Sequence, residues 1–190
     1  MGAIKSKIKY AILYGETGSG KTLLQYALQS SLNVIKEINA TEGYNYEEIE
    51  VNNIILGIFD ISGNLNQYDI VNIVTKYVSI NAIIFVVPMN KLDQIDKSRT
   101  QLELILCNKN LKDGMSLIVI YNKETKERDK TIWIPVSLLD SRMKLDKMKK
   151  KYKLLEVRSC VIDVSMHNDN DKIEFDKCIE SVVQNIDKEK

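Results

Sequence analysis

The chain has 190 residues, 44% of them hydrophobic and 28% charged, which is typical of one globular domain with a substantial core. Its 27 basic residues nearly cancel its 26 acidic ones, so we expect no nucleic-acid partner and no general attraction to anionic lipid. Three widely spaced cysteines, a single histidine and the absence of long apolar runs argue against disulfide scaffolds, zinc sites, membrane spans and secretory signals, and so predict a cytoplasmic protein.

The first predicted strand is Ile8 to Tyr14, a β-branched and aromatic run that ends at a glycine. A helix with apolar spacing is expected from Lys21 onward. Two further strand-like runs, residues 45–51 and 54–60, are joined by two asparagines, which tolerate a tight hairpin turn.

Strands and helices alternate in the rest of the chain. Later strands are predicted at Ala82–Val87, Ser116–Tyr121 and Ser159–Val164. Helices are predicted at Gln67–Val78, Gln94–Leu106, Val136–Lys150 and Lys172–Ile186. This alternation predicts an α/β fold, with helices on both faces of a mostly parallel sheet and the early hairpin adding one antiparallel edge strand. We expect one domain over residues 1–190, with a short N-terminal segment, residues 1–8.

The stretch GETGSGKT fits the phosphate-loop pattern G-x-x-x-x-G-K-S/T and lies between a predicted strand and a predicted helix. Glycines let the backbone fold tightly round a polyphosphate, so that N–H groups and a helix N-terminus converge on negative charge. Lys21 is expected to bridge the β- and γ-phosphates and the Thr22 hydroxyl to bind Mg²⁺. The predicted loop residues are Gly15, Glu16, Thr17, Gly18, Ser19, Gly20, Lys21, Thr22 and Leu23.

A metal-coordinating acid is expected where another strand ends, and Asp60 follows a hydrophobic run. Thr41, in a polar segment before the hairpin, could complete the Mg²⁺ shell when a γ-phosphate is present. Taken alone, an Asp at a strand end is usually a helix cap or a turn former. The order of Thr22, Thr41 and Asp60 along the chain favours the metal site.

From about Lys9 to Ile186 the sequence resembles the ADP-ribosylation factor (Arf and Arf-like) family of small GTPases. Thr41 to Gly63 is similar to the family's T-x-G-F-N switch I, its interswitch hairpin and the D-V-G-G-Q start of switch II. AIIFVV, SRTQLELIL and SLIVIYNKE resemble its fourth strand, third helix and fifth strand with the N-K-x-D motif. The resemblance implies a six-stranded Ras-like P-loop domain that binds GTP or GDP with Mg²⁺. Effectors would contact the switch and interswitch surface, where Tyr44 is expected.

The same resemblance assigns further site residues. The Gly63 amide would contact the γ-phosphate. Asn122 would tie the base loop to the phosphate loop, and the stem of Lys123 would cover the base. Ser165 and Met166 stand where the family has its last base-contacting loop.

Two departures from the family pattern affect hydrolysis and base selection. Asn64 replaces the catalytic Gln that orients water, and its amide is one methylene shorter, which can cost orders of magnitude in a positioning step. Thr125 replaces the Asp that accepts two hydrogen bonds from guanine, and neutral bonds are weaker than charge-assisted ones. We therefore expect slow or absent hydrolysis and weakened guanine preference. The alternatives are a pseudo-GTPase that holds its nucleotide permanently within an assembly and, less favoured, an ATP-binding P-loop kinase.

MGAIKS fits M-G-x-x-x-S/T, which makes Gly2 the expected myristoylation site. One myristoyl chain binds membranes weakly, so a second signal is needed, for which Lys5, Lys7 and Lys9 are candidates. A protein that holds the lipid is the alternative. The basic run Lys144–Lys153 is interpreted first as a solvated helix face and otherwise as a site for acidic protein or lipid. Peripheral membrane contact or an intracellular assembly is therefore the expected location.

Overall fold

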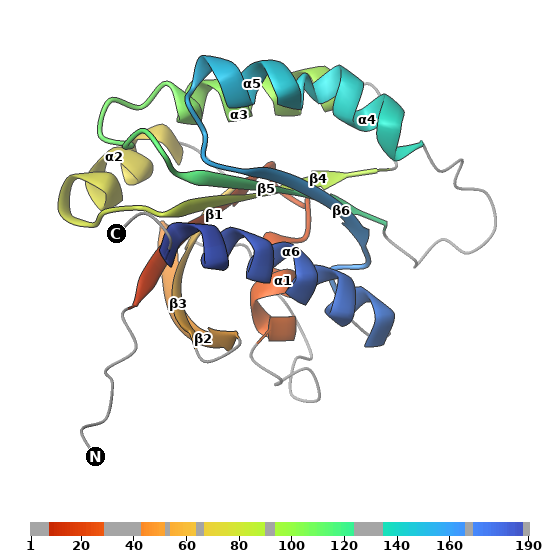
Figure 1. Ribbon diagram of the computed structural model, residues 1–190, viewed down its shortest axis with the longest axis horizontal. Helices are drawn as coiled ribbons and strands as arrows, with labels where there is room; N and C mark the ends of the chain where they lie inside the picture. Colours follow the sequence, from red (N-terminus) through yellow and green to blue (C-terminus); the bar gives the residue numbers. More distant parts are fainter. Residues whose placement is uncertain are drawn as a thin grey trace.

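The computed structural model describes residues 8–28, 43–51, 54–63, 67–89, 94–123, 135–165 and 169–187. These residues form a six-stranded sheet in the order β2-β3-β1-β4-β5-β6, with helices on both of its faces (Figure 1). The strands are β1 (Lys9–Gly15), β2 (Tyr44–Val51), β3 (Ile54–Ile61), β4 (Ala82–Pro88), β5 (Ser116–Asn122) and β6 (Val157–Ile162).

The predicted sheet is confirmed in its topology. The pairs β3–β1, β1–β4, β4–β5 and β5–β6 are parallel, and β2–β3 is antiparallel. Strand β2 ends the order, so within the described ranges it has a strand neighbour on one side only. This edge strand carries Glu47, Glu48 and Glu50.

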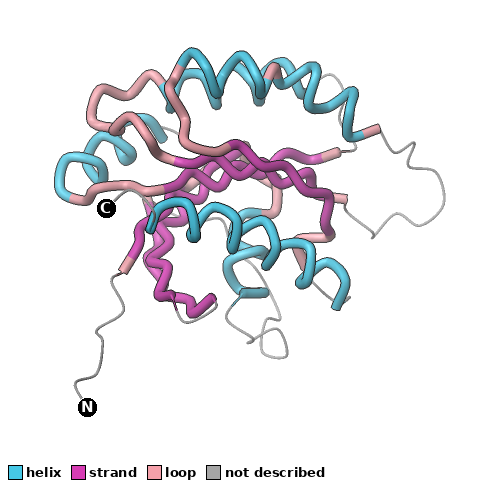
Figure 2. The backbone as a smooth tube through the Cα atoms, viewed as in Figure 1, coloured by secondary structure: helices cyan, strands magenta, loops and turns pink. Residues whose placement is uncertain are grey.

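The helices form two layers. They are α1 (Lys21–Leu28), α2 (Gln67–Tyr77), α3 (Ile95–Leu106), α4 (Val136–Met143), α5 (Leu145–Lys151) and α6 (Asp169–Asp187). Helices α2 to α5 lie over one face of the sheet, and α1 and α6 lie over the other (Figure 2). Among the residues described, no helix is both long enough and apolar enough to cross a bilayer.

Successive side chains along the strands pack alternately into two separate hydrophobic cores, one on each face of the sheet. On β1, Ile12 and Tyr14 belong to the core beneath α2 to α5, whereas Ala11 and Leu13 belong to the core beneath α1 and α6. Burial on both faces explains why the parallel strands appear in the sequence as continuous hydrophobic runs. Two packed faces hold the carboxyl ends of these strands in fixed positions, and the candidate site lies at that edge.

The helix predicted over Val136–Lys150 is divided at Lys144. This residue has a left-handed backbone with φ 54°, and its N–H donates to the carbonyls of Asp140 and Ser141, which ends α4. Met143 and Leu145 on the two sides of the break are both buried. The break therefore redirects the chain while both short helices keep their apolar sides on the sheet.

The boundaries of the last two elements also differ from the prediction. Strand β6 begins at Val157 rather than Ser159, because Val157 already pairs with Leu117 of β5. Helix α6 begins at Asp169 rather than Lys172, and two aspartates in its first turn suit the positive end of the helix. The three cysteines are free thiols.

Candidate functional site

The predicted phosphate loop joins β1 to α1 at the carboxyl edge of the sheet. Because β1 lies between β3 and β4, the loop sits near the middle of that edge. The Ser19 N–H donates to the Glu16 carbonyl at 3.1 Å, and the Leu24 N–H donates to the Gly20 carbonyl at 2.9 Å as the helix begins. The positive end of the α1 dipole is therefore directed at the loop.

Gly20 is required by the shape of this loop. Its φ is +98°, and a Cβ there would lie 2.7 Å from Val164 Cγ2 and 2.8 Å from Asn122 Nδ2. Backbone strain and lack of space thus both exclude a side chain. The glycine allows the phosphate loop to pack directly against the ends of β5 and β6.

The ammonium of Lys21 lies inside the loop. Its Nζ donates to the carbonyls of Gly15 at 2.9 Å and Glu16 at 2.8 Å, and the residue is 5% exposed. Burial lowers the pKa of Lys21 to about 8, and the negative charges of Asp60 and Glu16 oppose that shift. These two carbonyl oxygens accept hydrogen bonds from the Lys21 ammonium but carry no formal charge, so its positive charge is not neutralised by them. A buried cation at a helix N-terminus is well suited to a polyphosphate anion.

Thr22 and Asp60 are brought together as the metal prediction requires. Thr22 Oγ1 donates to Asp60 Oδ2 at 2.7 Å, and Asp60 is fully buried near the end of β3. A hydroxyl and a carboxylate beside the phosphate loop form an oxygen-only ligand pair, which fits Mg²⁺. The third predicted ligand, Thr41, lies outside the described residues.

Gly63 lies directly against the phosphate loop. A Cβ on Gly63 would be 2.6 Å from both Cα and N of Thr17, so a side chain there would force the two segments apart. The segment that follows β3 therefore starts in contact with the loop. The expected catalytic residue, Asn64, lies outside the described residues.

Two further residues contact the loop and were not expected from the sequence. Gln67, the first residue of α2, is 9% exposed, and its Nε2 donates to the Gly15 carbonyl at 3.5 Å. Lys97 Nζ of α3 lies 3.6 Å from Glu16 Oε1. Gln67 stands at the start of a predicted helix, and a polar residue in that position could have indicated a polar contact with a neighbouring loop. No local sequence pattern predicts the ion pair between Lys97 and Glu16.

Asn122, at the end of β5, connects two loops of the site. Its Nδ2 donates to the Ser19 carbonyl at 3.0 Å, and its Oδ1 accepts the Val164 N–H at 3.3 Å. One buried side chain thus joins the phosphate loop to the connection between β6 and α6.

Lys123 and Ser165 lie on neighbouring loops at the same edge. Lys123 Nζ forms a 2.8 Å ion pair with Asp171 Oδ1 in the first turn of α6, a contact that was not expected. The N–H and hydroxyl of Ser165 both donate to Asp163 Oδ1, at 2.9 and 2.6 Å. The predicted positions Met166 and Thr125 lie outside the described residues, as do Gly2, Lys5 and Lys7. Lys9, the third lysine predicted to contact a membrane, is only 7% exposed because it lies within β1, so it is not available for that contact.

The β2–β3 hairpin presents aromatic side chains next to the site. Tyr44 is 51% and Tyr46 36% exposed, and their ring centroids lie 6.0 and 4.8 Å from that of Phe59. Tyr44 therefore lies on the surface, where the sequence placed it. The cluster offers a partner a rigid aromatic contact area.

Residues 2–185 match the family model of the ADP-ribosylation factor family. ADP-ribosylation factor D of Dictyostelium discoideum is 32% identical over 122 residues, which are 63% of this chain and 53% of that protein. ADP-ribosylation factor-like protein 5A of Rattus norvegicus is 31% identical over 116 residues, which are 61% of this chain and 63% of that protein. The match thus spans less than two thirds of either relative.

Two solved structures are similar in fold. The Arl6 BBS3 small GTPase of Trypanosoma brucei, solved with the bound nucleotide analogue GppNp, has a TM-score of 0.67 at 17% identity and covers 94% of this chain and 99% of its own. The mammalian SRP receptor structure has a TM-score of 0.72 at 16% identity and covers 92% of this chain and 100% of its own. At these identities the likeness concerns the fold alone.

Proposed function

The chain belongs to the ADP-ribosylation factor family of small GTPases, and from that membership and the geometry of its phosphate loop we propose that it binds GTP or GDP and acts as a nucleotide-dependent switch. The observation that carries the proposal is the position of Lys21, whose buried ammonium lies within a main-chain turn at the start of α1. The Thr22–Asp60 contact adjoins it. Cation, amides and oxygen ligands together match a triphosphate with its metal.

Thr22 and Asp60 would hold Mg²⁺, with Thr41 joining them in the triphosphate state. The ion, when bound, would neutralise charge on the phosphate oxygens. Lys21 would bind the β- and γ-phosphates, and Gly63, already packed on Thr17, would offer its amide to the γ-phosphate. Ordering of the segments around Thr41 and Gly63 would report which nucleotide is bound.

We further propose that effector or assembly proteins contact the switch and interswitch surface around Tyr44 and Tyr46. These two exposed rings stand next to the nucleotide site on a hairpin anchored by Phe59. A membrane contact through a myristoylated Gly2 and nearby lysines belongs to the same proposal. The chain would act as one domain over residues 1–190.

A second candidate function is a pseudo-GTPase that keeps one nucleotide permanently inside an assembly. The substitutions Asn64 and Thr125 favour slow or absent hydrolysis and weak base selection. In this reading the nucleotide stabilises the fold instead of switching it.

Identification of the nucleotide released from purified full-length chain, followed by timed exchange against fluorescent GTP with and without Mg²⁺, tests both functions. GTP or GDP that exchanges supports the switch, and GTP or GDP that stays bound supports the pseudo-GTPase. Lys21→Ala is expected to lose binding, whereas Lys177→Ala on exposed α6 surface is the matched control. A chain that remains empty with millimolar purine triphosphates and Mg²⁺ would contradict both, and bound ATP would overturn the guanine assignment.

A further inference from the structure

Lysines gather at the edge of the sheet opposite the nucleotide site. They come from the end of α2, the connection between α3 and β5, and the end of α5, which lie on the left of Figure 1, near the amino ends of the parallel strands. All of them are exposed. We call this group the lysine edge: Lys76, Lys109, Lys112, Lys149, Lys150, Lys151 and Lys153.

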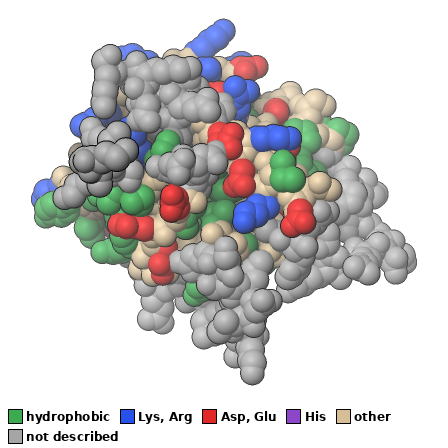
Figure 3. Space-filling view, turned by 60° about the horizontal axis from the view of Figure 1, so that its bottom comes forward, with side chains coloured by type: hydrophobic (Ala, Val, Ile, Leu, Met, Phe, Trp, Pro, Cys, Tyr) green, Lys and Arg blue, Asp and Glu red, His purple; other side chains and the backbone are tan. Residues whose placement is uncertain are grey.

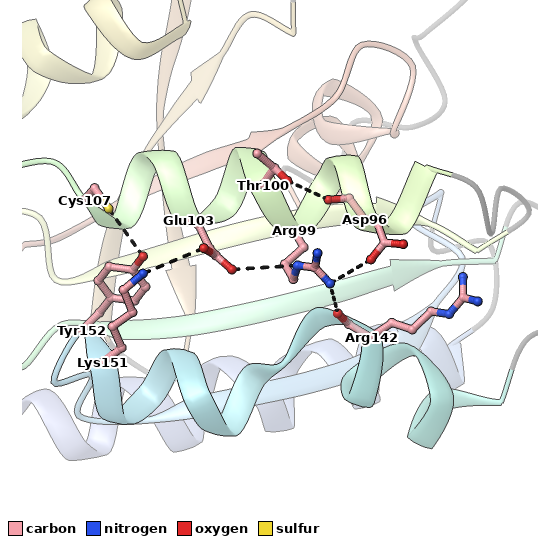
Figure 4. A network of polar contacts seen from close by, with 8 residues as sticks. All are labelled: Asp96, Arg99, Thr100, Glu103, Cys107, Arg142, Lys151 and Tyr152. Atoms are coloured by element: carbon pink, nitrogen blue, oxygen red, sulfur yellow. Dashed lines mark hydrogen bonds and ion pairs between the residues drawn. The ribbon is translucent and has the colours of Figure 1, made fainter.

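Contacts between the three elements make the lysine edge one continuous surface. Asn108 Nδ2 donates to Asn72 Oδ1 at 2.9 Å, which joins the α3–β5 connection to α2. The Gly114 N–H donates to the Lys153 carbonyl at 3.1 Å, which joins that connection to the segment after α5. Figure 4 shows the adjoining seam between α3 and α5, where Lys151 lies 3.9 Å from Glu103.

The charge of the lysine edge is largely uncompensated. Among the described carboxylates, Glu103 pairs with Lys151 and Asp113 pairs with Lys153 at 2.7 Å. Of the seven lysines, only Lys151 and Lys153 have an ion-pair partner among the described residues, which leaves five of the seven unpaired, although the whole chain carries a net charge of only +1. Figure 3 shows acidic side chains scattered, with few basic ones among them, over the described part of the face that carries α1 and α6. The charged side chains of the described residues are thus unevenly distributed.

The lysine edge also exposes apolar and aromatic groups. Tyr77, at the end of α2, is 77% exposed, with Lys76 Nζ 5.6 Å from its ring centroid. Ile73 lies one turn earlier and is 57% exposed. Exposed tyrosines beside lysines are typical of surfaces at a membrane interface, where the ring enters the headgroup layer and the ammonium reaches phosphate.

The residue type favours a lipid surface over a folded acidic partner. The exposed basic residues on the ends of α2 and α5 and on the α3–β5 connection are lysines, and the nearby Arg158 is already paired with Glu156. Lysines act as hydrated point charges on flexible stems, whereas fixed carboxylates on a protein are better recognised by the planar fork of arginine. Strand β1 starts at the same edge as its parallel neighbours β4, β5 and β6. The described part of the chain therefore begins, at Ile8, on this side of the fold.

We propose that the lysine edge docks on anionic phospholipid headgroups. It would be the second signal that a single acyl chain requires, and it would add to Lys5 and Lys7, since Lys9 is buried in β1. The nucleotide site and the aromatic hairpin would then face away from the bilayer, available to protein partners. The docking itself needs no nucleotide, so its test can fail or succeed independently of the proposed function.

The test is flotation of full-length, unacylated chain with vesicles of phosphatidylcholine, alone or mixed with phosphatidylserine, at low and high salt. We expect binding to the mixed vesicles that high salt weakens, and little binding to phosphatidylcholine. Lys149→Glu/Lys150→Glu should weaken binding about tenfold or more, since both lysines are exposed and the ion pairs of the described residues here involve Lys151 and Lys153 instead. Lys149→Arg/Lys150→Arg should bind like the natural chain, because the charge is kept.

The matched control is Lys172→Glu/Lys177→Glu, which makes the same charge change on exposed positions of α6, across the sheet. It should bind within about twofold of the natural chain if the surface, and not the net charge, decides. Equal losses in both double variants, or no preference of the natural chain for phosphatidylserine, would overturn the proposal. Capture of an acidic protein without any vesicle binding would also overturn it. Unchanged thermal unfolding of each variant shows that the fold is intact.

Discussion

Asn122 and Ser19 are 103 residues apart in the sequence but are joined by a hydrogen bond, which the Asn122 Nδ2 donates to the Ser19 carbonyl at 3.0 Å. The same amide accepts the Val164 N–H, so both of its polar atoms are used and the residue is 6% exposed. Only a side chain with one donor and one acceptor at this spacing can join both loops. The shape of the phosphate loop therefore depends on a residue outside it.

Asn122→Asp should loosen the site while keeping the side-chain volume. The carboxylate would face the Ser19 carbonyl with no donor, and we expect a loss of about 1–3 kcal/mol in the free energy of unfolding and faster nucleotide release. Denaturant unfolding and release of a fluorescent nucleotide measure the two effects. Asn110→Asp is the control: Asn110 is exposed and its Nδ2 donates only one long hydrogen bond, 3.4 Å to Thr75 Oγ1, so this variant should lose clearly less stability than Asn122→Asp. Equal stability of both variants would contradict the role of Asn122.

Nucleotide affinity should depend on pH through Lys21. Its pKa is about 8 in the free chain, and phosphate charge beside the ammonium raises that pKa in the complex. The complex then holds more protons than the free chain above pH ~8, so affinity is constant below that pH and falls by up to about tenfold per unit above it. Calorimetry in two buffers of different ionisation enthalpy measures the proton uptake. Lys21→Arg should abolish the uptake, and an unchanged uptake in that variant would refute the assignment.

Asp60→Asn should remove most of the stimulation of nucleotide binding by Mg²⁺. The amide keeps a partner for the Thr22 hydroxyl but loses the charge that holds the ion, so the affinity gained on adding Mg²⁺ should fall about tenfold or more. Equilibrium titrations with Mg²⁺ and with a chelator measure this difference. The double variant Thr22→Ala/Asp60→Asn should reduce the Mg²⁺-dependent gain in affinity little more than the more damaging single variant does, because both residues would bind the same ion. Full additivity would contradict a shared metal site.

Asn64→Gln should speed GTP hydrolysis, because it restores the reach of the amide that the family uses to orient water. We expect an increase of about tenfold or more in the single-turnover rate, with nucleotide affinity unchanged. Asn66→Gln, the same change two residues later, is the matched control. A natural chain that already hydrolyses GTP as fast as the glutamine variant would show that Asn64 does not limit the reaction.

Thr125→Asp should sharpen base selection. A carboxylate at this position can accept two hydrogen bonds from guanine, so the preference for GTP over ATP should rise about tenfold or more. Competition against a labelled nucleotide gives the ratio. Glu124→Asp tests the neighbouring acid and should leave the ratio unchanged. A natural chain that already strongly prefers GTP would place the base-reading group elsewhere.

The elements and the phosphate loop could be predicted because their signals are local. The strand before Gly15 and the helix after Lys21 follow from spacing of apolar residues, and the loop from its glycines and lysine. The contacts of Gln67 with Gly15 and of Lys97 with Glu16 could not be predicted, since they join distant segments through tertiary packing. The end of α4 at Lys144 was also missed, because a lysine in the left-handed region carries no glycine-like signal.

Within the described ranges the outer side of β2 has no strand neighbour, and the charge along it bears on how two copies of this chain would meet. An open strand offers its backbone groups to any extended peptide, but here Glu47, Glu48 and Glu50 run along it. A second copy that presents the same strand meets like charge and is repelled, which opposes growth of a continuous ribbon. A lysine-rich peptide would meet attraction at the same place. The strand therefore discriminates among incoming strands by charge before any backbone bond can form.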